Sequence, residues 1–268
     1  MSPRSQNILA KLECPSRVWA VAAIHGQAEQ LADLHGILET RIARGDRVVY
    51  LGNYLGHGEA VVATLDELLS FRHSFLTIPG VEPQDIVYLR GAQEEMWRKL
   101  LQIQLASAPA EVFDWMIGQG VGSTLRAYGG SPDAAYARFR EGVLSTTKWT
   151  GQLREGVKSR PGHDQLLASL HRAAYSEGGE LLLVHAGIDP HRPLSEQGDA
   201  FWWGSGYFAD IVEPFQGFRR VIRGYDRDHA GVQFGPVTAS IDGGCGFSGP
   251  LNAVCFDLTG RIADRIEV

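Results

Sequence analysis

Six short apolar runs, each followed at once by a glycine-containing turn with polar side chains, constrain the fold of this chain more than any other feature. They occupy residues 18–27, 47–58, 86–95, 181–190, 221–231 and 240–254. Short apolar runs rich in β-branched residues predict buried strands, and glycine lets the chain turn sharply after each one. The pattern therefore predicts a protein built on buried strands, with polar side chains at the strand ends.

The composition excludes several classes of protein. At 268 residues the chain is long enough for one large α/β domain or two small ones, and 44% hydrophobic residues indicate a real core. A net charge of −6 gives no basic surface for nucleic acid or an anionic membrane. No 18-residue apolar run and no signal-peptide core are present. Three cysteines without CxxC spacing (Cys14, Cys245 and Cys255) fit a reducing compartment, so we expect a cytoplasmic protein.

Strands alternate with helical patterns over the first hundred residues. Strands are predicted at residues 18–23, 47–51 and 85–89. Apolar residues recur at helical spacing after each strand, most clearly over residues 27–44. Repeated β-α-β units predict parallel strands joined by crossover helices.

The pattern changes after residue 107. Over residues 107–162 no strand signal appears, and glycines, prolines and scattered aromatic residues favour a helical insertion over a long structureless loop. A helix is then predicted at about 164–175. Further strands are predicted at 180–185, 219–222, 238–242, 251–258 and 261–268. With no long helices between them, the second half is predicted to be mainly β, so that two facing sheets are covered by helices outside.

In order and phrasing the six turns resemble those of the phosphoprotein-phosphatase branch of the calcineurin-like metallophosphoesterases. In that family these turns have the sequences GDxHG, GDxxDRG, GNHE, VHAG, HGHT and IDTG. The resemblance covers roughly residues 17–266 and is most specific in VHAGIDP (184–190) and in the final turn, 240–254. Bacterial serine/threonine phosphatases and diadenosine-tetraphosphatase-like proteins are the subgroups it resembles best. It implies one domain over residues 1–268, a four-layer α/β/β/α sandwich with the helical insertion, and a site at the strand ends.

The resemblance also implies where metal ligands belong, and most of those positions have lost them. Enzymes of this class hold two cations about 3.5–4 Å apart, which clamp the phosphate and generate a hydroxide nucleophile. Two of the six ligand positions keep the family's histidine, as His25 and His185. The other four hold Ala23, Asn53, Ala92 and Tyr225. We therefore expect no metal cofactor. The alternative is one Mn, Fe or Zn ion on His25, Asn53 and His185, helped by Tyr225 or Asp226.

The groups that would assist catalysis are replaced as well. Gln93 stands where the family has its acid histidine, Gly56 where it has the supporting aspartate, and His57 where it has a phosphate-binding arginine. A second such arginine corresponds to Ser205. Carboxylates facing one another without a metal repel or take up protons, so their joint loss is consistent with a site that no longer holds metal.

Other polar and aromatic residues near the turns allow two interpretations. Asp226, Asp228 and His229 either rebuild a metal site with His185 or form a solvated loop. Trp202 and Trp203 form either a binding wall or part of the core. The resemblance implies a mainly structural role for Asp242. Glu94 and Glu95 follow the third turn at a helix start, where acidic residues are ordinary.

The function predicted from these residues is that of a degenerate phosphatase-like protein, a pseudophosphatase with a binding or regulatory role. Its partner is then an unknown protein or a small phosphorylated ligand. The candidate cleft-binding residues are His25, Asn53, His57, His185, Tyr225 and Asp226. The alternative is a metal-dependent phosphoesterase, of the protein serine/threonine phosphatase or dinucleoside-polyphosphate hydrolase type, with a residual or rebuilt site. In a third hypothesis the chain is a subunit that acts through its exposed surface.

Overall fold

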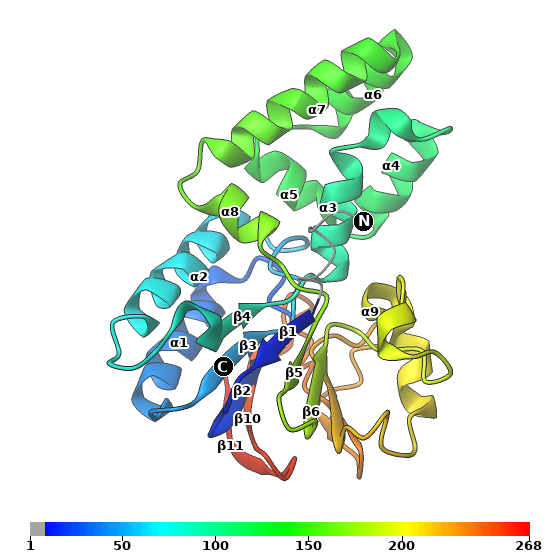
Figure 1. Cartoon of the computed structure of the whole chain (residues 1–268). Coiled ribbons are helices and arrows are strands. Elements are labelled where there is room, and N and C mark those ends of the chain that lie inside the picture. Colours follow the sequence, from blue (N-terminus) through cyan, green and yellow to red (C-terminus); the bar gives the residue numbers. More distant parts are fainter. Residues whose placement is uncertain (1–8) are drawn as a thin grey trace.

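The computed structural model describes residues 9–268, and two β-sheets form its centre (Figure 1). The expected domain covers residues 1–268, and its first eight residues lie outside the part of the chain that the structure describes. The two sheets face each other across one large apolar core, to which strands of both sheets contribute.

The first sheet contains the β-α-β units predicted from the first hundred residues. Its strand order is β11 (Ile262–Glu267), β10 (Asn252–Asp257), β2 (Arg17–Val21), β3 (Arg47–Tyr50) and β4 (Ile86–Tyr88). Strands β2, β3 and β4 are parallel. The crossover helices are α1 (Ala28–Arg41) and α2 (Val61–Phe75). Both helices bury apolar residues, such as Leu34 and Leu68, in the core shared with this sheet (Figure 1).

The second sheet is built from short strands of the second half of the chain and one N-terminal strand. Its order is β1 (Leu9–Leu12), β5 (Ala173–Ser176), β6 (Leu181–Val184), β7 (Arg220–Arg223), β9 (Thr238–Ser240) and β8 (Gln233–Phe234). Alternate residues of β6 face opposite sides, as the pleat requires. Leu181 and Leu183 join the core between the sheets, whereas Leu182 and Val184 pack with residues of α9 (Ala200–Trp203). These outer contacts provide the fourth layer.

The segment predicted as a helical insertion is helical. It contains α4 (Pro109–Gly118), α5 (Val121–Ala127), α6 (Pro132–Glu141) and α7 (Val143–Lys158). It follows α3 (Ala92–Leu100) and precedes α8 (His163–Ala168), and α6 and α7 project away from the sheets (Figure 1). Phe113 is fully buried there, with the rings of Tyr136, Phe139 and Trp149 around it.

The prediction of a helix at 164–175 is wrong over its second half. Helix α8 ends at Ala168, and Ala173–Ser176 form β5, which lies between β1 and β6. Two neighbouring strands supply backbone partners that outweigh the helical propensity of His-Arg-Ala-Ala. Strand β1 was not predicted either, because its parallel pairing with β5 joins segments far apart in the sequence. Within residues 9–268, none of the helices has the length and apolar character needed to cross a membrane.

The insertion shares the main core, so we predict that wild-type protein unfolds in a single cooperative transition. Phe113→Ala should lower the free energy of unfolding by about 3–5 kcal/mol without splitting the transition. Urea unfolding followed by circular dichroism and by tryptophan fluorescence measures both properties. The partly exposed Phe234→Ala serves as a control that should change stability little. Two separate transitions would show that the insertion is an independent domain.

Candidate functional site

The turns that follow the strands meet at one end of the two sheets, where backbone hydrogen bonds connect them. The His25 N–H donates to the Asn53 carbonyl (2.6 Å), and the Ala23 N–H donates to the Gly224 carbonyl (3.0 Å). The Gly224 N–H in turn donates to the His185 carbonyl (3.0 Å). The first, second, fourth and fifth turns are therefore held together by main-chain contacts that do not depend on side-chain identity.

Several residues in these turns have left-handed backbone conformations that side chains other than glycine seldom adopt. Positive φ angles occur at His25 (54°), Asn53 (57°), His57 (51°) and His229 (46°). Such conformations cost free energy and concentrate at functional sites. The turns keep a backbone geometry suited to presenting side chains into a common space.

The second and third turns are joined by the buried carboxylate of Glu94. Its oxygens accept four backbone hydrogen bonds of 2.8–3.0 Å, from the N–H groups of Asn53, Tyr54, Leu55 and Gly91. Burial raises the pKa of Glu94, and backbone N–H donors, including those of Leu55, Asn53 and Gly91, oppose that rise. The turns approach so closely that a Cβ added at Gly91 would lie 2.3 Å from the Asn53 nitrogen. The helix-start role expected for Glu94 is present in its bond to Gly91, but the other three bonds organise the cleft.

Asn53 lies at the position that the resemblance assigns to a bridging aspartate, and its amide is held in one orientation. Its Oδ1 accepts a hydrogen bond from the Gln93 backbone N–H (2.9 Å), so its Nδ2 donates to His25 Nε2 (3.3 Å). This arrangement assigns the proton of neutral His25 to Nδ1, which is buried without a partner among residues 9–268. The Asn53 amide N–H therefore occupies the lone pair of His25 Nε2, which is then not free to bind a metal.

His185 has a different arrangement, in which one ring nitrogen keeps a free lone pair. Its Nδ1 donates to the Leu51 carbonyl (2.7 Å), which leaves Nε2 as a buried acceptor without a partner in the described part of the chain. The Tyr225 ring stacks on the imidazole, with centroids 5.2 Å apart and planes 4° from parallel. Tyr225 thus covers a face of His185.

Aromatic rings fill the space in front of these residues. We call the group formed by His25, His57, His185, Tyr225, His229 and Phe247 the ring cluster. Phe247 lies between three of the histidines, with centroid distances of 5.2 Å to His25, 4.4 Å to His57 and 4.0 Å to His229. Phe247 was not predicted from the sequence. The one feature that could have indicated it is that it is the single aromatic residue in the glycine-rich final turn.

The ring cluster is largely uncharged at neutral pH. Burial lowers the pKa of His25 well below its ordinary value and lowers that of His185 to about 4. Burial also lowers the pKa of His57 and raises that of Tyr225 to about 12. His229 differs, because its hydrogen bond to Asp242 (2.9 Å) raises its pKa.

The insertion closes over the positions where the family has its acid histidine and supporting aspartate. The Gln93 side chain donates to the Gln119 carbonyl (2.6 Å), and the Gly56 N–H donates to Thr124 Oγ1 (3.0 Å). The His57 N–H donates to the Gly120 carbonyl (3.0 Å), and a Cβ added at Gly120 would lie 2.6 Å from the His57 ring. The residues at 56, 57 and 93 therefore attach the insertion to the second and third turns.

The carboxylate of Asp226 in the fifth turn is engaged by a buried arginine. Asp226 forms an ion pair with the buried Arg223 (2.6 Å), and Arg223 also donates to Ser205 Oγ (3.1 Å) and Ser240 Oγ (3.0 Å). Arg223, which the sequence analysis did not single out, thus lies beside the position assigned to the family's second arginine. Asp242 accepts bonds from the Asp226 N–H and from His229.

The residues present do not fit the dinuclear metal centre that the resemblance implies. The methyl groups of Ala23 and Ala92 are buried where the family has oxygen ligands. Asn53 Oδ1 and His25 Nε2 already accept hydrogen bonds, and His185 Nε2 is a buried acceptor without a partner among residues 9–268. Across residues 9–268 no group of three or more His, Cys, Asp or Glu side chains is placed to hold a metal ion. Two dications need bridging and terminal carboxylates, which this cleft lacks.

Comparisons with known proteins identify the fold. Scans against protein-family models and against curated protein sequences gave no match. Among solved structures, a putative diadenosine tetraphosphatase is similar at a TM-score of 0.57 and 18% identity, over 97% of this chain and 98% of the other. A Saccharomyces cerevisiae serine/threonine phosphatase with similarity to human PP5 has a TM-score of 0.53 at 14% identity, over 99% and 84%.

A cold-active protein tyrosine phosphatase is similar at a TM-score of 0.52 and 13% identity, over 100% of this chain and 83% of the other. These likenesses extend over nearly the whole chain. The metallophosphoesterase fold predicted from the order of the six turns is therefore confirmed. At such identities the likeness concerns the fold alone.

The role of Glu94 predicts a large loss of stability when its second oxygen is removed. In Glu94→Gln, an NH₂ group faces backbone N–H donors, so the free energy of unfolding should fall by roughly 2–4 kcal/mol. Denaturant unfolding measures this loss. Glu39→Gln, an exposed change on α1, should fall within about 0.5 kcal/mol of wild type. Equal stabilities of the two variants would contradict the role assigned to the Glu94 carboxylate.

The buried neutral histidines predict a stability that decreases in acid. Because the pKa of His185 is about 4 in the folded protein and near its ordinary 6.5 when unfolded, unfolding takes up a proton between these values. The contribution is present above pH 6.5 and is lost as the pH falls toward 4, by roughly 3 kcal/mol at most. Unfolding free energies across this range should fall less steeply in His185→Gln. The exposed His73→Gln should keep the wild-type slope; a parallel slope in His185→Gln would oppose this account.

Proposed function

We propose that this chain is a pseudophosphatase: a protein with the phosphatase fold that hydrolyses phosphoesters weakly or not at all and acts by binding. One observation supports the proposal above the others. Backbone hydrogen bonds join the turns, but the side chains that face the common space form the ring cluster, in which burial lowers the pKa of His25, His57 and His185. A cleft of this composition lacks the carboxylate ligands for two cations, and Gln93, at the position that the resemblance assigns to the acid histidine, has no ionisable proton.

Electrostatics supports the same proposal. Two divalent cations bring four positive charges into a buried space, and their desolvation is offset in such enzymes by carboxylate ligands. Here Asp226 is engaged by Arg223, and Asp242 by His229 and two backbone N–H groups. The remaining polar atoms are neutral imidazole and amide groups. A dinuclear centre would therefore lack compensation for its charge.

The binding role belongs to the part of the cleft that solvent reaches. Phe247 is 41% exposed, and His57 and His229 beside it are partly exposed. We propose that this face, together with the adjoining insertion, recognises a protein or a small phosphorylated ligand. Ring stacking and the His229–Asp242 pair are the interactions it offers.

The second candidate function is a metal-dependent phosphoesterase with a residual site, and the arrangement of His185 favours it. A histidine whose Nδ1 is oriented by a carbonyl, with a free Nε2, has the form of a metal-ligating histidine. One Mn, Fe or Zn ion would use His185 with His25 and Asn53. For that, the Asn53 amide must give up its bond to the Gln93 N–H or its donation to His25.

Metal content and turnover on one sample separate the two functions. Purified protein should contain no stoichiometric metal by elemental analysis, before or after incubation with manganese. It should also show no turnover of p-nitrophenyl phosphate. About two metals per chain with turnover would overturn the pseudophosphatase proposal. One metal with slow turnover that is lost in His185→Ala would support the residual phosphoesterase instead.

Restoring ligands tests whether the frame is preserved. The combined variant Ala23→Asp, Asn53→Asp, Ala92→Asn and Tyr225→His should bind Mn²⁺ in calorimetry where wild type does not, because the backbone still presents these positions together. Asn53→Asp alone is the matched control and should bind Mn²⁺ at least about tenfold more weakly than the combined variant, since ligands act jointly. A folded combined variant without Mn²⁺ binding would show that the frame has been remodelled.

A further inference from the structure

A separate cavity lies behind the cleft, between α3, α7 and α8. Its volume is about 220 Å³. We call it the α3–α7–α8 pocket. Helix α3 and the residue after it contribute Trp97 and Leu101, α7 contributes Val157, and α8 contributes Leu167. These side chains give the pocket apolar walls, which suit the body of an organic molecule.

One polar atom in these walls lacks a partner. Trp97 is 3% exposed, and its Nε1 has no hydrogen-bond acceptor within residues 9–268. A buried N–H without an acceptor costs free energy, and most such groups in folded proteins are satisfied. Because Trp97 lines the pocket, an acceptor oxygen of a bound molecule that reaches this N–H would satisfy it.

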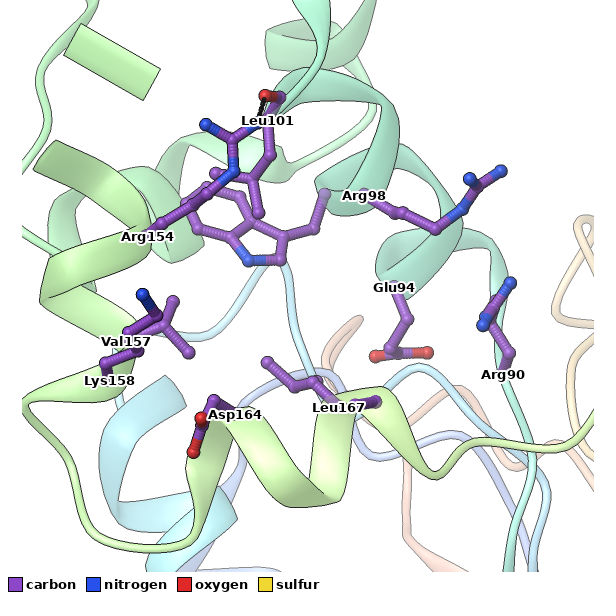
Figure 2. A pocket seen from close by; sticks show the side chains of 11 residues that line it. Arg90, Glu94, Arg98, Leu101, Arg154, Val157, Lys158, Asp164 and Leu167 are labelled. Carbon is purple, nitrogen blue, oxygen red and sulfur yellow. Dashed lines mark hydrogen bonds between the residues drawn. The ribbon is translucent and has the colours of Figure 1, made fainter. Parts of the chain in front are cut away.

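The charged residues around the pocket are mainly cationic. Four basic and two acidic side chains line it: Arg90, Arg98, Arg154, Lys158, Glu94 and Asp164 (Figure 2). The Glu94 carboxylate is engaged by four backbone N–H groups, as described above. Arg90 and Arg98 both pair with Glu95, which does not line the pocket.

Arg154 is the cation best placed to meet an anionic ligand. It is half-buried on α7, and it donates to the Leu101 carbonyl and, at 3.4 Å, to Thr150 Oγ1. Within the described chain it has no carboxylate partner at salt-bridge distance. Lys158, one turn further along α7, pairs with the exposed Glu155. Arg154 is therefore a cation beside the apolar walls that has no carboxylate partner among residues 9–268.

We propose that the α3–α7–α8 pocket binds a small organic carboxylate with an apolar, benzoate-sized body. The body packs against Trp97, Val157 and Leu167. The carboxylate accepts from Trp97 Nε1–H and from the Arg154 guanidinium, which suits carboxylate geometry. A volume below the roughly 300 Å³ at the lower end of drug-sized sites limits the ligand to one ring or a short chain. Inorganic phosphate has no apolar body and would leave the walls uncovered.

The pocket is distinct from the cleft and independent of the function proposed for it. Glu94 lines the pocket and also holds the second turn of the cleft, so the two spaces lie on either side of one side chain. Occupancy of the pocket requires no metal and no catalysis.

Nuclear magnetic resonance of the indole N–H groups tests the proposal in the intact protein. The chain has six tryptophans, and the Trp97 signal is assigned as the one missing in Trp97→Phe. Benzoate should shift that signal with a Kd below about 1 mM. Benzyl alcohol and benzylamine, which keep the ring without the negative charge, should bind at least about tenfold more weakly. Phosphate at the same concentration should leave the Trp97 signal in place.

Three variants separate the parts of the site. Arg154→Met keeps the apolar stem and removes the charge, so it should weaken benzoate binding about tenfold or more. Val157→Phe fills the cavity and should abolish binding, whereas Arg160→Met, an exposed change outside the pocket, should leave it unchanged. Unfolding midpoints confirm that each variant is folded. The proposal is overturned if benzoate does not shift the Trp97 signal, or if folded Val157→Phe binds benzoate like wild type. Equal binding of benzoate and benzyl alcohol would show that the negative charge does not contribute, and would overturn the proposal that the ligand is a carboxylate.

Discussion

The carboxylate of Glu94 is the interaction on which the architecture of the cleft depends. Four backbone N–H groups in two turns find no other acceptor within residues 9–268, and one side chain satisfies all of them. Burying a charge is costly unless it is well paired, and the four donors supply that pairing. This carboxylate holds the position of Asn53 and the start of α3, and from there Gly56 and Gln93 bond to the insertion.

Around that anchor, backbone and side chains have separate roles. The main-chain bonds between turns and the left-handed residues His25, Asn53 and His57 fix how the turns meet. The side chains decide what fills the space between them. There the imidazoles, a tyrosine and Phe247 pack together through ring contacts.

The insertion connects the cleft to the pocket behind it. Its α4–α5 turn bonds to the second turn and to Gln93, while α7 forms a wall of the pocket that Glu94 also lines. Gly56, His57 and Gln93 thus attach the insertion to the second and third turns. If the cleft binds a partner as proposed, this attachment reduces the entropy lost on binding, because the surface is preorganised.

The sequence alone determined the two-sheet α/β fold and the helical character of the insertion, because strand periodicity, glycine positions and turn order are local properties. It did not determine the edge strand β1, the end of α8 at Ala168 or the insertion of Phe247 among three histidines, because these depend on contacts between distant segments. Nor did local patterns indicate that Asp226 turns to Arg223 or that Glu94 joins two turns. Only tertiary structure decides which buried polar atoms find partners, since each partner comes from another part of the chain.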